Sequence, residues 1–142
     1  MNKLQRDFVD MITDKLPHTL SIRTRIYIAC QFALESNYGK SRLATDQLNF
    51  CGMKRATQRI STRLNVCDNC FATYNSLEDC ISDYLLWLAM KGAKQDLSIF
   101  ILKHYLLSYC PDAGYIGRID AVYNNYCHNV LHWVFPPQAS ED

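Results

Sequence analysis

The sequence predicts a mostly helical α+β domain with a small antiparallel β-hairpin insertion, and three observations lead to this fold class. A chain of 142 residues has the usual length of one domain. Apolar residues recur at three- and four-residue steps before residue 48 and again after residue 76, as on one face of a helix. The stretch between them mixes β-branched and polar residues in rough alternation. We expect residues 1–135 to form a single domain and residues 136–142 to be a disordered tail.

Two helices and a short helical piece are expected in the first third of the chain. The apolar stripe over residues 4–16 predicts the first helix, which Pro17 ends. Ser21 is a good N-cap for the second helix, because its hydroxyl can accept a hydrogen bond from an otherwise unpaired backbone N–H. This helix is expected to end within residues 35–39, and the short helical piece follows at 41–47.

The chain is expected to return to helix after the predicted hairpin. The segment RISTRLNVCDNCFATY should reverse direction at Asp68-Asn69, since both residue types favour turns. Ser76 can N-cap the next helix. Two further helices are expected at about residues 96–108 and 115–131. In this layout the insertion and the helical body form two walls of a cleft, and clefts are where ligands bind.

Composition argues against two classes of partner. With 15 Lys and Arg against 14 Asp and Glu, the net charge is only +1, so no broad positive field favours nucleic acid. No apolar run approaches the ~18–20 residues of a membrane helix, so we expect no membrane insertion. Basic residues do gather in one short run, which more often marks a solvated loop than a polyanion site. They are Lys54, Arg55, Arg59 and Arg63.

The cysteines bear on where the chain folds and on whether it holds a metal. Seven cysteines form an odd set, so at least one thiol has no partner within the chain. The N-terminus lacks the unbroken apolar core of a signal peptide, and both features favour folding in a reducing cytoplasm. Cys67 and Cys70 have the spacing of half a zinc site or of a redox pair. A structural pair at a hairpin tip is the preferred interpretation, and we predict no metal and no cofactor.

A dense motif surrounds Glu35, which on composition alone could be a surface charge at a helix end. The segment CQFALESNYGKSRLATDQLNFCGMK resembles the signature of glycoside hydrolase family 73, the glucosaminidases of bacteria and phages, with Cys30 in place of an alanine. A chance match of this density is improbable. The matching residues are Ala33, Leu34, Glu35, Ser36, Tyr38, Gly39, Lys40, Ser41, Leu43, Ala44, Asn49, Phe50, Gly52, Met53 and Lys54.

Two later segments resemble the same family in order and spacing, which extends the similarity to residues 5–130. FATYNSLEDCISDYLLWL resembles the family's segment that leads into a helix, and YCPDAGYIGRI resembles its tyrosine-containing segment. Ala72 is a departure, because the family usually has arginine there. The matching residues are Phe71, Tyr74, Ser76, Glu78 and Asp79 in the first segment, and Tyr109, Asp112, Tyr115 and Ile119 in the second.

The resemblance implies a lysozyme-like fold and an endo-β-N-acetylglucosaminidase that cleaves the β-1,4 bond between N-acetylglucosamine and N-acetylmuramic acid in peptidoglycan. This chemistry needs a carboxylic acid that keeps its proton near neutral pH, and an apolar wall can raise a glutamate pKa toward ~6. We therefore expect Glu35 to be the general acid. The wall would consist of Phe32, Leu34, Tyr38 and Phe50. A muramidase or lytic transglycosylase of the same fold is an alternative, as is a non-catalytic wall-binding or structural phage module.

The group that completes the reaction could be a carboxylate or the substrate itself. Glu78 is the best second carboxylate, expected at ~6.5–9.5 Å from Glu35 in an inverting enzyme, and Asp79 is a weaker substitute. An acid in the first turn of a helix is also favoured by the helix dipole without any catalytic task. In the other scheme the substrate's N-acetyl oxygen assists, oriented by Tyr115 or Tyr109, of which Tyr115 is slightly favoured.

Four more residues are candidates for binding the glycan strands of peptidoglycan. Tyr38 and Tyr74 could stack on sugar faces, Asn49 could hydrogen-bond an acetamido group, and Phe50 follows it in the motif; each could equally belong to the core. Without a signal peptide, the protein would be made in the cytoplasm and would reach the wall as a phage lysin or virion component, or by another export route of a bacterial host. Other phage virion or lysis proteins would then be further partners.

Overall fold

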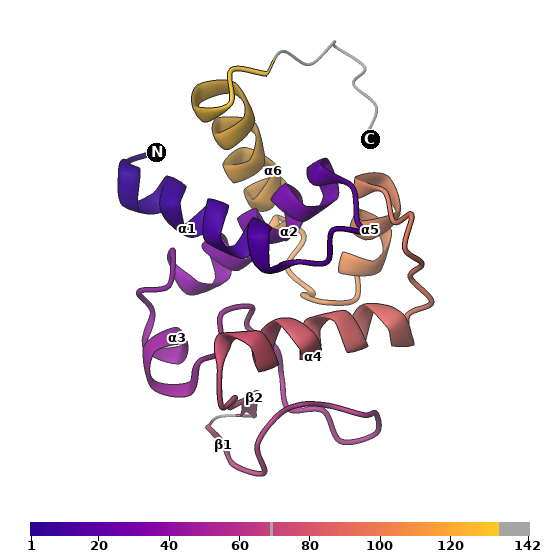
Figure 1. Ribbon diagram of the computed structural model, residues 1–142. Coiled ribbons are helices and arrows are strands. Elements are labelled where there is room, and N and C mark those ends of the chain that lie inside the picture. The colour runs from indigo at the N-terminus through magenta and orange to yellow at the C-terminus, as the bar shows by residue number, and fades with distance from the viewer. Residues whose placement is uncertain (69, 134–142) are drawn as a thin grey trace.

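The computed structural model describes residues 1–68 and 70–133, so the tail expected at 136–142 lies outside the described residues. Figure 1 shows a body of helices, with α4 crossing the molecule between this body and an irregular insertion that holds the two strands. The elements are α1 (Lys3–Lys15), α2 (Ile22–Ser36), α3 (Arg42–Gln47), β1 (Cys67–Asp68), β2 (Phe71–Ala72), α4 (Leu77–Met90), α5 (Ile99–Leu106), α6 (Tyr115–Asn125) and a π-helical turn (Tyr126–Val130).

Helix α2 is the centre of the helical body, and local sequence sets both of its ends. Ser21 caps it by accepting a hydrogen bond from the Thr24 N–H, as predicted. At the other end Asn37 adopts the left-handed conformation, with φ of 48°. Most of the helix is buried, and α1, α5 and α6 pack against it. The apolar face of α1 supplies Phe8, Val9 and Ile12 to this core.

The later helices follow the predicted order with shorter bounds. Ser76 caps α4 as expected, and Ser98 caps α5, which covers only the middle of the predicted 96–108 segment. The last helix widens after Asn125 into a π-helical turn, where the Tyr126 hydroxyl donates a hydrogen bond to Asp10 on α1. Within the described residues, no helix combines the length and apolar character needed to span a bilayer.

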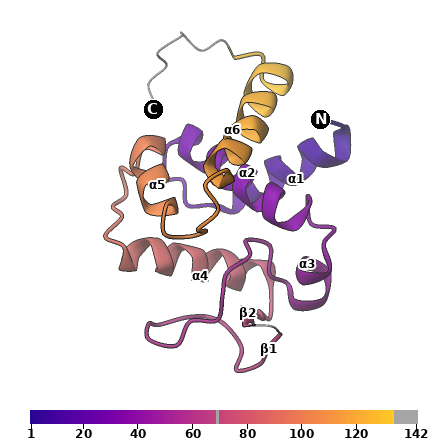
Figure 2. The same cartoon turned by 180° about the vertical axis from the view of Figure 1, so that it is seen from behind.

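The predicted hairpin is present, although it is only two residues long on each side. Its strands are antiparallel, with Cys67 opposite Ala72 and Asp68 opposite Phe71. Asp68, one of the two predicted turn residues, is paired with Phe71 in the ladder, and Asn69 lies outside the described residues. Figure 2 shows the same insertion from behind, on the far side of α4 from α6. Backbone hydrogen bonds outside this short ladder also hold the insertion, among them Leu64 N–H to the Thr73 carbonyl at 2.8 Å and Ala72 N–H to the Met53 carbonyl at 3.0 Å. Two buried side chains add to them.

Asn49 is the first of these side chains, and it is almost completely buried. Its amide nitrogen donates to the carbonyls of Met53 and Ala72, both at 2.9 Å, and its oxygen accepts from the Met53 N–H at 3.2 Å. Both amide hydrogens are therefore used inside the protein. The expected hydrogen bond from Asn49 to a substrate acetamido group finds no support here, because Asn49 fastens the loop to the hairpin instead.

Asp83 is the second, a fully buried carboxylate on α4 that ties the insertion to the body. One oxygen lies 2.6 Å from the Arg59 guanidinium, and the other accepts a hydrogen bond from the Tyr74 hydroxyl. A buried carboxylate requires such partners because desolvation otherwise makes its charge very costly. Tyr74 is accordingly buried and bonded inside the protein, which gives no support to the expected stacking on sugar.

Candidate active site

Glu35 lies in the last turn of α2, just before the chain turns sharply. The Ser36 hydroxyl donates to the Phe32 carbonyl at 2.7 Å and accepts from the Gly39 N–H at 2.8 Å, so one buried side chain fixes both the helix end and the turn. Three consecutive residues of this turn, Asn37, Tyr38 and Gly39, have positive φ. The residues of the motif that follow Glu35 thus end α2 and form a tight turn directly after the carboxylate.

Gly52, in the first loop of the insertion, approaches the Glu35 carboxyl so closely that a side chain at position 52 would have to displace it. A Cβ atom built on Gly52 would lie 2.2 Å from Oε2 of Glu35, and the φ of +69° also favours glycine. Backbone from the insertion therefore covers the carboxylate that the helical body presents. The glycine of the Gly-Met-Lys motif is explained by this close approach.

The pKa of Glu35 is raised above its ordinary value near 4.5, and burial is the main cause. A hydrogen bond from Tyr115 and the charge of Arg118 act in the opposite direction without cancelling the effect of burial. No cation of the described residues lies within salt-bridge distance of this carboxyl. Glu35 thus keeps its proton to higher pH than an exposed glutamate does, as a general acid must.

A chain of buried hydrogen bonds leads from α4 through α2 to Glu35. The Tyr84 hydroxyl donates to Oε1 of Gln31 at 2.6 Å, and Nε2 of Gln31 donates to the Tyr115 oxygen at 2.8 Å. Because an amide N–H can only donate, the Tyr115 proton is left to point at Glu35. Burial and the Glu35 charge raise the pKa of Tyr115, so it stays protonated and remains a donor.

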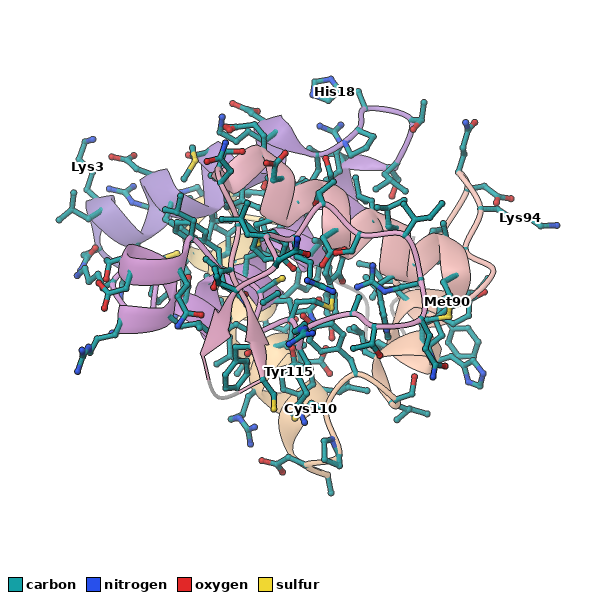
Figure 3. The ribbon with its side chains drawn as sticks, turned by 90° about the horizontal axis from the view of Figure 1, so that it is seen from below. Lys3, His18, Met90, Lys94, Cys110 and Tyr115 are labelled. Atoms are coloured by element: carbon teal, nitrogen blue, oxygen red, sulfur yellow. The ribbon has the colours of Figure 1, made fainter. Side chains whose placement is uncertain are left out.

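Tyr109 lies against Tyr115 and holds the backbone beside Gly52. The two rings are stacked, with centroids 6.2 Å apart and planes 10° apart. The Tyr109 hydroxyl donates to the Cys51 carbonyl at 2.5 Å. In Figure 3, seen from the side of the insertion, Tyr115 lies close to the segment that carries Cys110. Both predicted tyrosines are therefore near the carboxylate, Tyr115 in contact with Glu35 and Tyr109 behind it.

A cavity of about 480 Å³ opens next to this group of residues. Gly52 and Tyr109 belong to its wall, so the cavity borders the backbone that covers Glu35. Its other lining residues are Met53, Lys54, Arg55, Ala56, Thr57, Gln58, Arg59, Trp87, Met90 and Ser108. The volume falls within the range of ordinary ligand sites.

Glu78, the predicted second carboxylate, has a different environment from Glu35. Its side chain is exposed, and an ion pair with Lys15 at 3.1 Å is the main cause of its lowered pKa. Glu78 is also absent from the groups that shift the pKa of Glu35, although two carboxylates sharing a site raise each other's pKa. This position argues against the second-carboxylate role. Asp79 lies beside it in the first turn of α4, where its N–H is capped by Ser76.

Tyr38 and Phe50 pack against the first helix. Phe8 makes an edge contact with Tyr38, at 6.3 Å between ring centroids, and a stacked contact with Phe50 at 6.4 Å. Both rings are half-buried, and neither lines the cavity. Their binding of sugar stays a prediction.

The Cys-x-x-Cys pair is only partly covered by the structure. Cys70 is exposed and free, whereas the side chain of Cys67 lies outside the described residues. Among the side chains that are described, no three metal-ligating residues gather into one site. The preferred structural interpretation of the pair stays a prediction.

Several residues of the site carried no separate signal in the sequence. Gln31 precedes Glu35 by four residues, which places both on one face of α2, and that spacing could have identified it. Tyr84 and Arg118 come from distant helices, so only the fold brings them to the site. The Gly52 backbone and the Tyr115 hydroxyl lie against the carboxyl, and the expected apolar wall of Phe32, Leu34, Tyr38 and Phe50 stays a prediction.

Comparison with known proteins identifies a family for this chain. The chain matches the family model of glucosaminidases, described as mannosyl-glycoprotein endo-beta-N-acetylglucosaminidase, over residues 13–128. A search of curated protein sequences finds no match.

Two solved structures share the fold at low sequence identity. One is a type VI secretion system effector-immunity complex from Pseudomonas protegens, with a TM-score of 0.64 and 16% identity over 85% of this chain and 92% of that chain. The other is the catalytic domain of the autolysin Auto from Listeria monocytogenes, with a TM-score of 0.58 and 19% identity over 89% of this chain and 86% of that chain. The expected lysozyme-like fold class is confirmed. With most of its length matched by the family model, the chain belongs to the glucosaminidase family, glycoside hydrolase family 73.

Proposed function

We propose that this protein is an endo-β-N-acetylglucosaminidase that cleaves peptidoglycan, with Glu35 as the general acid. The observation that carries the proposal is a carboxyl group with a raised pKa, covered by Gly52 and hydrogen-bonded by Tyr115. Family membership and the two fold relatives support the coarser conclusion, a peptidoglycan hydrolase. One of those relatives is an autolysin domain, which is consistent with a cell-wall substrate.

In the first step, Glu35 gives its proton to the glycosidic oxygen while the bond from that oxygen to the anomeric carbon breaks. Positive charge then develops on the sugar ring. As Glu35 becomes ionised, the hydrogen bond from Tyr115 stabilises its new negative charge, since the relay through Gln31 leaves the Tyr115 proton directed at it. Burial therefore keeps Glu35 protonated before the step, and the hydrogen bond from Tyr115 stabilises its carboxylate after the proton has left.

For the second step we favour assistance by the substrate's own N-acetyl group. Its carbonyl oxygen bonds to the anomeric carbon, and water later opens this ring and returns a proton to Glu35. The support is that none of the carboxylates described here acts on the pKa of Glu35 and that Glu78 is paired with Lys15. This route retains the configuration at the anomeric carbon. Proton NMR of the first-formed product would show the β-anomer, whereas the α-anomer would indicate direct attack by water.

The test of the proposed function is product analysis of digested peptidoglycan. Mass spectrometry of the reduced products should show N-acetylglucosamine at the new reducing ends. Reducing N-acetylmuramic acid would indicate a muramidase, and anhydro-muramic ends a lytic transglycosylase. Glu35→Gln should abolish product formation, with Glu78→Gln as the matched control on an exposed glutamate. If the parent and the Glu35→Gln protein both bind the wall equally well and neither cleaves it, the protein is a non-catalytic module. Phage origin is a separate prediction that neither outcome tests.

A further inference from the structure

The basic run of the sequence lines the cavity beside Glu35 and is not simply a solvated loop. Lys54, Arg55 and Arg59 all contribute to the cavity wall. The chain has no acidic residue between Asp46 and Asp68, so this loop carries no internal compensation. None of the lining residues is a carboxylate. The cavity therefore has a positive lining.

The basic side chains of this run differ in whether their charge already has a partner inside the protein. Arg59 pairs with the buried Asp83 at 2.6 Å, and Arg63 donates to the carbonyls of Ala56 and Leu64. Lys54 is exposed at the cavity, and no carboxylate of the described residues lies within salt-bridge distance of its amine. The uncompensated charge at the cavity thus includes that of Lys54.

The position of the cavity indicates what kind of ligand could bring a negative charge to Lys54. Its wall passes through Gly52, the residue that covers Glu35, and includes the apolar side chains of Trp87 and Met90. A sugar can lie on such apolar surface, while a charged substituent of that sugar reaches Lys54. A ligand in this cavity would therefore lie against Gly52, the residue whose backbone covers Glu35.

We propose that the cavity binds a carboxylate carried by the glycan strand, with Lys54 as its principal charge partner. The inference rests on the proposed function, since it assumes a peptidoglycan strand at Glu35. Each N-acetylmuramic acid of such a strand supplies a carboxylate in one of two ways. Where its lactyl group is free, the lactyl carboxylate is the source, and where a stem peptide is amide-linked to that group, the carboxylates of the peptide are. A polymer of N-acetylglucosamine alone has neither, so the cavity distinguishes wall glycan from uncharged glycan of the same linkage.

Calorimetric titration of the Glu35→Gln protein tests this without requiring turnover. The probes are a tetrasaccharide of alternating N-acetylglucosamine and N-acetylmuramic acid with free lactyl carboxylates, its methyl ester, and the same glycan with stem peptides attached. The free acid should bind about fivefold more tightly than the ester at low ionic strength, a preference that salt weakens. Adding Lys54→Ala should remove the preference, and Lys54→Arg should keep it. Lys3→Ala is the matched control, because Lys3 and Met90 lie at opposite sides of the molecule in Figure 3.

The outcomes separate the two carboxylate sources and the two proposals. A Lys54-dependent preference seen only with the peptide-bearing glycan would assign the stem peptide as the source and would still support the cavity's role. Equal binding of all three probes, or a preference that survives Lys54→Ala, would overturn it. Wall cleavage that depends on Glu35 would leave the proposed function standing in that case, so the two failures are distinguishable.

Discussion

Glu35 and Asp83 each hold a carboxyl group away from bulk water, and they differ in what surrounds it. Asp83 is fully buried, with the Arg59 guanidinium in contact and the Tyr74 hydroxyl as a donor. Glu35 has the Gly52 backbone against it and a hydrogen bond from Tyr115, and the charge of the described residues that acts on its pKa is that of Arg118. Both lie where the insertion meets the helical body.

The difference shows how one small fold uses buried charge for two purposes. A paired carboxylate such as Asp83 can hold an irregular loop on a helix, because its charge is compensated in the folded state. A carboxylate left without a cation is a weaker structural element, but its raised pKa lets it store and release a proton. That no salt bridge to Glu35 forms within the described part of the chain is thus as informative as the salt bridge at Asp83.

Breaking the structural carboxylate should have the largest effect on folding. Asp83→Asn removes the negative charge and leaves Arg59, only 13% exposed, without a counter-ion. We expect a loss of about 3–5 kcal/mol in the free energy of unfolding, measured by urea denaturation. Arg42→Ala is the control, since its ion pair with Asp46 is exposed and should contribute under ~1 kcal/mol. A loss for Asp83→Asn as small as that of the control would show that the insertion is held by other contacts.

Gly52→Ala should reverse this pattern by affecting catalysis far more than folding. The new methyl group would displace the carboxyl end of the Glu35 side chain, which is flexible and can move. The free energy of unfolding should therefore fall only by the strain of a positive φ at a non-glycine residue, about 1 kcal/mol. Displacing an acid by an ångström can cost about 10²-fold in rate. Kinetics on soluble glycan and thermal unfolding of the same sample would check both. Retention of full activity would mean that the covered position of Glu35 is not required.

Removing a member of the hydrogen-bond relay should have a smaller effect on rate. Tyr84→Phe deletes the donor that orients Gln31, and Gln31→Leu deletes the donor to Tyr115. Each should lower kcat by about tenfold, with KM little changed, because the relay acts on Glu35 through Tyr115. Gln31→Glu should not restore the rate, because it presents an acceptor where Tyr115 needs a donor. Equal loss of stability and activity in Gln31→Leu would indicate packing alone.

The smallest expected effect is a gain of stability in Glu35→Gln. A carboxyl whose pKa is higher in the folded state than in the unfolded state binds more protons when folded, so the folded protein loses stability as pH rises through that interval. Replacing Glu35 with neutral Gln removes this penalty at neutral pH and changes little near pH ~3, where both states are protonated. Urea denaturation of parent and variant at the two pH values would check the sign. A destabilised Glu35→Gln at neutral pH would show that the carboxylate helps to hold the fold.

Local sequence predicted the helices and the place of Glu35 at a helix end, because the signals lie within a few residues of each other. Ser21 and Ser76 cap their helices as expected. Glu35 lies at the end of α2 because the Asn37–Gly39 turn ends the helix there. The position of the hairpin was likewise predictable, but not its register, since a two-residue strand offers too little alternation to fix it.

The surroundings of the acid were not predictable, because they depend on contacts between distant segments. Asn49 and Tyr74 are polar or aromatic residues in a family motif, which suggested substrate binding, yet their partners are Ala72 and Asp83 inside the protein. Glu78 matched the family pattern but faces solvent and pairs with Lys15 from α1. Spacing along the chain does not show which polar groups from distant segments the fold will bury together.

Carbon-13 NMR titration of the glutamate carboxyl groups is the most direct test of the central claim, that burial makes Glu35 a proton donor. The Glu35 resonance is assigned by its loss in Glu35→Gln, and Glu78 serves as an internal reference in the same spectra. The account predicts a Glu35 midpoint above 4.5, moving further up in Tyr115→Phe, and a Glu78 midpoint below 4.5. A Glu35 midpoint at or below that of Glu78 would contradict it.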